Sequence, residues 1–130
     1  MDIDAPHTAL LAAGVRSFFR LAEEWQLSEA EQIILLGLPP NFELDRWRRG
    51  DIVAANGETL ERISYLLGIY KAIHTLLPVP ARATRWMRAP NSAPMFGDTS
   101  ALDRMLSGNI ADLRSVRAYL DAQLGKGATW

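Results

Sequence analysis

Cysteine is absent from the 130 residues of this chain, and histidine occurs only twice, at His7 and His74. The absence of cysteine excludes disulfides and thiolate metal sites. The two histidines lie far apart in the sequence, and no spacing of carboxylates suggests that either one belongs to a metal site. We therefore predict that the protein binds no metal and needs no cofactor.

Catalytic motifs are also missing. The chain has no nucleophilic cysteine, no Gly-x-Ser-x-Gly turn, no glycine-rich phosphate loop and no second histidine near His74. His74 falls on an apolar stripe of a long predicted helix, where a packed histidine with one hydrogen bond is the simplest interpretation. We predict that the protein is not an enzyme and has no catalytic residue.

Long apolar runs are absent as well. No stretch reaches the roughly 18 apolar residues of a membrane helix, and no cationic start is followed by the apolar run of a secretory leader. The net charge of −1 is not that of a basic nucleic-acid-binding domain. We expect a cytoplasmic protein that makes no membrane contact.

Helical periodicity is what the chain does have. Apolar residues make up 48% of it, which is enough for one core, and strand-like alternation is absent. We predict an all-α fold: a compact multi-helix domain with a helix-turn-helix-like N-terminal half and a small helical C-terminal half. The predicted helices cover approximately residues 8–25, 29–36, 41–50, 57–77, 81–87, 99–107 and 110–124.

Short polar residues mark where several of these helices begin. A serine followed three residues later by a glutamate forms a capping box, in which each side chain bonds the other residue's backbone amide. Asparagine and aspartate also cap helices well. The predicted N-caps are Ser28 with Glu31, Asn56, Asp98 or Thr99, and Asn109 with Asp112.

The Pro78-Val-Pro80 break divides the chain into a helix-turn-helix-like region, 1–77, and a C-terminal region, 78–130. The long helix 57–77 carries two apolar stripes, and Ser64, Gly68 and Ala72 form a row of small residues that lets another helix approach closely. That helix belongs either to the same chain or to a second subunit. We predict a homo-oligomer formed through helix 57–77, with the intrachain alternative left open.

Residues 28–50 resemble a helix-turn-helix that ends in a tryptophan followed by basic residues and glycine. The cations can face phosphates, and a polar side chain at the start of the second helix can reach base edges. The predicted DNA-binding residues are Asn41, Arg46, Arg48 and Arg49. Acidic neighbours bring the net charge of residues 41–52 to zero, which opposes DNA binding. In the alternative interpretation, Trp47 packs in the core and the arginines form surface ion pairs.

Residues 86–108 place several turn formers between two helical segments, in a connection longer than helical domains usually contain. Residues 82–130 hold seven basic and four acidic residues, so this third of the chain is basic. Arg82, Arg85 and Arg88 stand three apart on a short predicted helix. Loops of this kind often serve contact, so we expect the functional surface here.

Several short motifs follow one another in a fixed order. In residues 86–124 they are Trp86, Pro90-Asn91, Phe96-Gly97, Leu102, Leu106-Ser-Gly108 and Val116-Arg-Ala-Tyr-Leu120. In residues 10–77 they are Leu27-Ser28, Leu36-Gly37, Arg46-Trp47, Gly50-Asp51 and Leu66-Leu67-Gly68-Ile69-Tyr70. Together they resemble Xre/MbcA/ParS-type antitoxins, although residues 96–101 lack a second glycine and a proline expected in that family.

The resemblance implies a type II antitoxin whose C-terminal region covers the active site of a RES-domain toxin that degrades NAD⁺. It also implies larger toxin–antitoxin assemblies and repression of the antitoxin's own operon. On this interpretation the predicted toxin-binding residues are Arg85, Arg88, Asn91, Met95, Phe96, Arg114, Arg117, Lys126, Thr129 and Trp130. The alternative function is a helix-turn-helix transcriptional regulator without a toxin partner.

Two local alternatives stay open for these residues. Trp86, Met95 and Phe96 either face a partner or close the core of the C-terminal half, and Asn91 either meets a partner or bonds its own backbone in a turn. The glycines at 125 and 127 release a tail in which Trp130 is either an aromatic plug for the toxin pocket or a frayed end.

Overall fold

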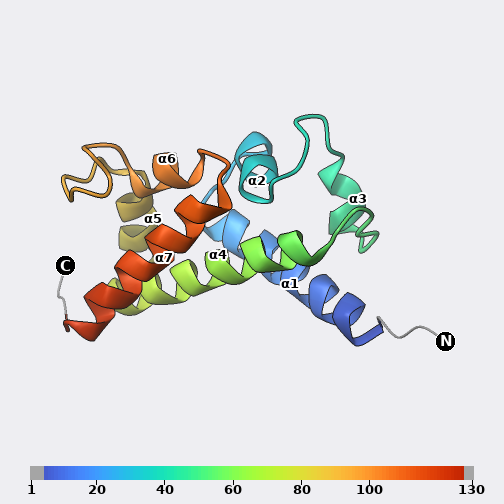
Figure 1. The fold of residues 1–130 in the computed structure, drawn as a ribbon, viewed down its shortest axis with the longest axis horizontal. Helices are drawn as coiled ribbons and strands as arrows, with labels where there is room; N and C mark the ends of the chain where they lie inside the picture. Colours follow the sequence, from blue (N-terminus) through green and yellow to red (C-terminus); the bar gives the residue numbers. More distant parts are fainter. Residues whose placement is uncertain (1–4, 128–130) are drawn as a thin grey trace.

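The computed structural model describes residues 5–127, and in that range the chain forms seven α-helices and no β-strand (Figure 1). The predicted all-α fold is confirmed. The helices are α1 (Ala5–Glu24), α2 (Glu29–Leu35), α3 (Leu44–Arg48), α4 (Gly57–Leu76), α5 (Pro80–Arg88), α6 (Ala101–Met105) and α7 (Ile110–Gly125).

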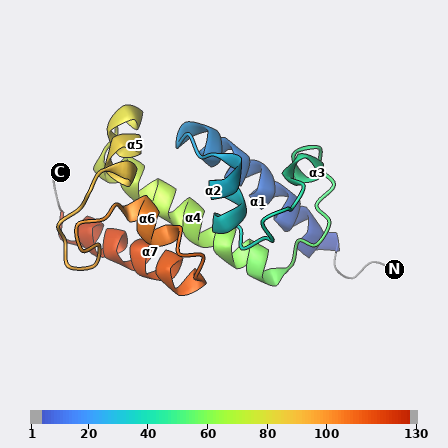
Figure 2. The same cartoon turned by 90° about the horizontal axis from the view of Figure 1, so that it is seen from above.

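Helix α4 is the central element of the structure. Helices α1 and α7 both pack along it, and its course spans the molecule, so that the N-terminal and C-terminal halves share it (Figures 1 and 2). Its buried side chains belong to one apolar cluster with side chains from both halves, such as Phe18 and Met105. A helix that is apolar on two sides is therefore covered on two sides by its own chain.

The row of small residues on α4 is occupied by α7. A Cβ atom on Gly68 would lie 2.5 Å from Cζ of Arg117, and the same guanidinium donates a hydrogen bond to the carbonyl of Ser64 over 3.4 Å. The intrachain alternative is thus the correct one for this row, and a partner subunit would have to use a different face of α4.

A cluster of aromatic and titratable side chains joins the end of α1 to α4. Trp25 Nε1 donates to His74 Nε2 over 3.4 Å, and the Tyr70 hydroxyl donates to the Glu24 carboxylate, which raises the pKa of Tyr70 to about 12. The rings of Tyr70 and His74 lie 4.1 Å apart. Burial lowers the pKa of His74, against the opposing effect of Glu24. The prediction of a packed histidine with one hydrogen bond is confirmed.

Two predicted helix starts are confirmed with their side-chain bonds. Ser28 Oγ accepts the amide of Glu31 over 3.1 Å, and the Glu31 carboxylate accepts the amide of Ser28 over 2.8 Å. Asn56 caps α4 and forms the corresponding reciprocal pair with Thr59. Capping involves residues three apart, so it is readable from the sequence alone.

The helix predicted for 41–50 begins later than expected. The amide of Phe42 donates to the carbonyl of Pro39, which makes a turn, and Glu43 has a ψ of 88°, so α3 starts only at Leu44 and contains five residues. Asn41 therefore lies in a turn before the helix and not at its first turn. The preference of Pro39-Pro40 and Asn41 for turns explains the difference.

Two predicted caps in the C-terminal half are wrong in detail. The N-cap of α6 is Ser100, which forms a capping box with Asp103. Asp98 has the left-handed φ of 70°, which an N-cap does not adopt. Asn109 is the N-cap of α7, as predicted, but its side chain makes no cap bond. The carboxylate of Asp112 instead accepts hydrogen bonds from Ser107 and Arg104, which hold its pKa below the ordinary value.

A buried arginine joins the two halves near the start of α4. Arg62 is 7% exposed, and its guanidinium donates to the carbonyl of Leu35 over 3.4 Å and to the carbonyl of Gly108 over 2.9 Å. Gly37, at φ +71°, leaves the guanidinium room, because a Cβ there would lie 2.5 Å from Nε of Arg62. This one side chain therefore links the end of α2 to the turn between α6 and α7.

Candidate functional site

The long loop between α5 and α6 is closed at its base. Pro90 and Ser100 form an antiparallel bridge, the amide of Asn91 donates to the carbonyl of Thr99 over 3.0 Å, and the amide of Asp98 donates to the carbonyl of Asn91 over 2.9 Å. Loops whose ends meet in this way, and which pack on their own side chains, are frequently functional. The loop of residues 90–100 therefore has a defined shape in the chain alone.

Phe96 anchors this loop to the core. Its side chain is 3% exposed, and its ring meets those of Trp86 and Tyr119 edge to face, with centroids 6.1 Å and 5.3 Å away. The phenyl ring is consequently not available for surface contact in the chain alone, because the two flanking aromatic rings cover it. Of the two interpretations left open for Phe96, the structure favours closing of the core.

Arg104 fixes the loop from the other side. Its guanidinium donates to the carbonyl of Met95 over 2.6 Å and to the carboxylate of Asp112 over 2.7 Å. It therefore connects the loop to the first turn of α7. Met95 itself is half-buried, and Ser92, Pro94 and Thr99 are exposed on the loop.

The side chain of Asn91 is used within the loop, since its Oδ1 accepts the amide of Ala93 over 2.9 Å. Asn91 therefore makes the local turn bond of the second interpretation, in which its side chain bonds its own loop and not a partner. The predicted residue thus lies at the neck of the loop and helps to form it.

Helix α5 carries a row of arginines beside this loop. Pro80 begins the helix, and Ala83 and Met87 are its buried residues, which leaves Arg82 and Arg85 exposed. Within residues 5–127, neither of these two arginines has an ion-pair partner. They are therefore exposed cations without an ion pair on the helix that leads into residues 90–100.

Arg88, the third arginine of the row, forms bonds within the chain. Its guanidinium donates to the carbonyls of Trp25 and Gln26 over 3.2 Å and 2.8 Å and lies 3.4 Å from the carboxylate of Glu31. These bonds hold the end of α5 against the turn between α1 and α2. The side chain is still partly exposed.

The predicted cations of α7 face a different direction. Arg114 donates to the Tyr65 hydroxyl over 3.0 Å and lies 3.7 Å from Glu61, and Arg117 contacts Asp121 and the backbone of Ser64. Both therefore lie along the seam between α7 and α4, away from the aromatic side of α7 that meets Phe96.

The predicted toxin-binding residues thus separate into groups. Arg85 lies on α5, and Asn91, Met95 and Phe96 lie in the loop that follows it, while Arg114 and Arg117 follow α4, and Lys126 is exposed just after α7. Thr129 and Trp130 lie outside the described residues. We call the exposed parts of α5 and of residues 90–100 the α5–loop surface.

The sequence did not identify the side chains that support the α5–loop surface from inside the molecule. Arg104 acts through the backbone carbonyl of Met95 and Tyr119 through the ring of Phe96, and neither contact leaves a local pattern in the sequence. Only the Ser100–Asp103 pair carried a readable signal, the three-residue spacing of a capping box.

Two of the four predicted DNA-binding residues, Arg46 and Arg48, lie in ion pairs. Arg46 contacts Asp51 at 2.6 Å, and Arg48 contacts Asp45 at 2.6 Å and lies 5.1 Å from the ring centre of Phe19. Trp47 is buried and donates to the carbonyl of Val53 over 2.8 Å. The packing and ion pairs of the alternative interpretation are therefore present, and Arg49 is exposed without an ion pair in the described part of the chain.

Comparison with known proteins gives two matches. Residues 74–126 match the family described as the antitoxin Xre/MbcA/ParS C-terminal toxin-binding domain, which is not catalytic. An uncharacterized protein of Sinorhizobium fredii, y4oB, is 42% identical over 119 residues, which cover 91% of this chain and 89% of that protein. No solved structure matches. Within residues 5–127, no helix is long and apolar enough to cross a membrane.

Proposed function

Because this chain belongs to the family of antitoxins with an Xre/MbcA/ParS C-terminal toxin-binding domain, we propose that it neutralises a RES-domain toxin by covering the toxin's NAD⁺-degrading active site. The observation that carries this proposal is the α5–loop surface, which lies inside the matched residues and combines a closed loop with unpaired cations.

The closed loop favours binding because it is ordered before the partner arrives. Ordering a loop residue costs roughly 1–2 kcal/mol of conformational free energy. Folding of the chain alone already orders the loop, through the bridge between Pro90 and Ser100, the buried Phe96 and the hydrogen bond from Arg104. The conformational free energy is therefore lost on folding and not on binding. The binding free energy is then not reduced by loop ordering.

The exposed arginines of α5 give the α5–loop surface positive charge. Arg82 and Arg85 are exposed and form no ion pair within residues 5–127, so their charge is available to a partner. Complementary charge raises association rates and selects partners. We expect acidic side chains on the toxin where it meets α5.

The tail contributes a separate part of the proposal. Thr129 and Trp130 follow the glycine-spaced end of α7, and they lie outside the described residues. In our proposal they enter the toxin's NAD⁺ pocket, with the tryptophan as the aromatic anchor. Deletion of residues 128–130 separates this contribution from that of the α5–loop surface.

The test is coexpression with the proposed RES-domain toxin, with both genes under foreign promoters. The wild-type chain is expected to restore growth and cellular NAD⁺. The double variant R82E/R85E is expected to lose rescue, whereas R16E/R49E, which changes charge equally at exposed positions elsewhere, is expected to keep it. Full rescue by R82E/R85E would refute the role of the α5–loop surface.

Deletion of residues 128–130 is compared in the same assay. Partial or complete loss of rescue is the expected result if the tail enters the pocket. If rescue and NAD⁺ levels stay at the wild-type value, the plug is wrong, and the α5–loop surface alone carries neutralisation.

Repression of its own operon is the second part of the proposed function. Arg49 is the predicted DNA-binding cation that is exposed and has no ion pair in the described part of the chain. We expect the toxin complex to bind the operon's promoter with salt-sensitive affinity, and R49E to weaken that binding. Absence of promoter binding with and without toxin would remove this function.

A further inference from the structure

Arg62 lies in the first half of α4, outside residues 74–126, which match the toxin-binding domain. Its guanidinium is nevertheless bonded to both halves of the chain, through the carbonyls of Leu35 at 3.4 Å and Gly108 at 2.9 Å. Figures 1 and 2 show α2 and the connection from α6 to α7 beside the same part of α4. The question is what this one side chain does for the α5–loop surface.

The two carbonyls that Arg62 bonds lie where helices end. Helix α2 ends at Leu35, and the last carbonyls of a helix have no amide donor within it. Gly108 lies between α6 and α7. A cation is favourable beside a helix C-terminus, because partial negative charge gathers there. The planar guanidinium has its donors in a fixed arrangement, so it sets the position of the end of α2 relative to the turn before α7.

Stability alone does not explain the burial of this guanidinium. Arg62 is 7% exposed, and its Nε has no hydrogen-bond acceptor within residues 5–127. Its acidic contact is the carboxylate of Glu58 at 3.5 Å, on a side chain that is itself 58% exposed. An apolar side chain of similar size is often no less stabilising than a buried charge of this kind. The arrangement that Arg62 specifies is therefore the better explanation for it.

A series of hydrogen bonds continues from Gly108 to the α5–loop surface. Ser107, the residue before Gly108, donates to the carboxylate of Asp112. Arg104 donates to the same carboxylate over 2.7 Å and to the carbonyl of Met95 over 2.6 Å. Displacement of the turn at Gly108 therefore displaces the group that holds the loop.

We propose that Arg62 is a positioning residue that couples the end of α2 to the α5–loop surface. An occupied surface holds the loop, the turn at Gly108 and the guanidinium in one arrangement, and the carbonyl of Leu35 is held with them. Coupling between two sites is reciprocal, so release of the end of α2 weakens occupancy of the surface by the same factor. The identity of the occupant, a RES-domain toxin, rests on the proposed function, whereas the coupling inside the chain does not.

Hydrogen–deuterium exchange of the full chain alone tests the coupling. Arg62→Met keeps an unbranched apolar stem and removes both bonds. It is expected to speed exchange roughly tenfold at two separate places, the amides of residues 36–38 after α2 and the amides of Asn91 and Asp98 at the base of the loop. Arg62→Lys keeps the charge but lacks the planar set of donors, so its exchange at both places should be intermediate.

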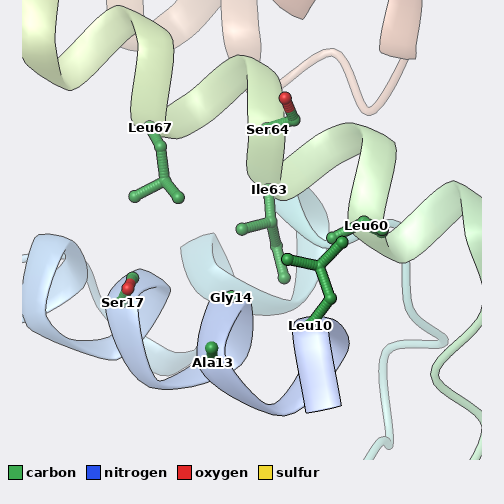
Figure 3. A pocket seen from close by; sticks show the side chains of 8 residues that line it. All are labelled: Leu10, Ala13, Gly14, Ser17, Leu60, Ile63, Ser64 and Leu67. Carbon is green, nitrogen blue, oxygen red and sulfur yellow. The ribbon is translucent and has the colours of Figure 1, made fainter. Parts of the chain in front are cut away.

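The matched controls are Ile63→Val and Ile63→Ala, at the next position of α4. Figure 3 shows Ile63 directed into the hollow between α1 and α4, and its side chain is buried. The two truncations remove different amounts of buried apolar side chain, so they bracket the stability loss of R62M. They are expected to speed exchange across the core without a particular effect on residues 36–38 and the base of the loop.

The second measurement adds a purified RES-domain toxin. Bound toxin is expected to slow exchange of residues 36–38 about threefold in the wild type, and R62M should lose this protection. The coupling is overturned if R62M changes residues 36–38 and the base of the loop no more than the Ile63 variants do. It is also overturned if bound toxin leaves residues 36–38 of the wild type unprotected, or protects them equally in R62M. A wild-type chain that binds no toxin would instead refute the proposed function, and exchange in the chain alone would then decide the coupling.

Discussion

Replacement of Phe96 by alanine tests whether packing of this one side chain in the core holds the loop of residues 90–100 in place. The side chain is 3% exposed and contacts two aromatic rings edge to face. Truncation of a buried phenylalanine to alanine costs about 3–5 kcal/mol, to which each lost aromatic pair contributes about 0.5–1.5 kcal/mol. One kcal/mol lowers the melting temperature of a domain of this size by about 3–5 °C. The expected decrease for F96A is therefore about 9–25 °C.

The same variant should weaken toxin binding more than it reduces the folded fraction. Release of residues 94–98 from the core returns conformational freedom that binding must then remove, at roughly 1 kcal/mol for each ordered residue. We expect the affinity for the toxin to fall at least tenfold, which is about 1.4 kcal/mol. Calorimetry with purified toxin at a temperature where F96A is folded measures this directly.

Two further variants make the result interpretable. F96L keeps much of the volume and loses the ring pairs, so it should cost about 1–2 kcal/mol and leave most of the affinity. F42A is the control, because it removes a half-buried ring far from the loop in sequence and outside the matched residues. The centroid of that ring lies 5.2 Å from the centroid of the Trp47 ring. If F42A weakens toxin binding as much as F96A, or if F96A melts within a few degrees of the wild type, the reasoning about the loop anchor is refuted.

Two other perturbations address the joint between the halves and the histidine cluster. Gly37→Ala should lower stability by about 1–3 kcal/mol in chemical denaturation, because alanine is strained at φ +71° and its Cβ displaces the Arg62 guanidinium; an unchanged midpoint would refute this. Since burial lowers the pKa of His74, the unfolded state binds more protons, so stability should fall as pH decreases from about 7 through the ordinary histidine pKa. His74→Gln should flatten that dependence between about pH 7 and pH 5; an equal slope in both proteins would contradict it.

The sequence predicted most helices because their signals are local. The apolar spacing of α1 and α4 and the caps at Ser28 and Asn56 depend on residues three or four positions apart. The predicted start of α6 was wrong for a different reason. Residues 98–100 are all plausible caps, and closure of the loop between Asn91 and Thr99 decides which of them is extended.

The sequence predicted the candidate site as a region and could not give the side-chain contacts within it. Sequence spacing indicated the arginines of α5 and the loop after it, and in the structure Arg82 and Arg85 are exposed and the loop is closed at its base. The partners of Arg88 and Arg104 could not be inferred, because they bond backbone carbonyls whose position follows from tertiary packing. The same applies to Arg114, whose direction depends on the docking of α7 against α4.

The most direct test of the central claim is inhibition of NAD⁺ hydrolysis in a purified system. A purified RES-domain toxin, the proposed partner, is incubated with NAD⁺ and increasing amounts of the full chain, and the remaining NAD⁺ is measured. We predict that hydrolysis falls to background with the wild-type chain and that R82E/R85E needs at least tenfold more protein for the same effect. Hydrolysis that continues undiminished at saturating wild-type chain would contradict the account.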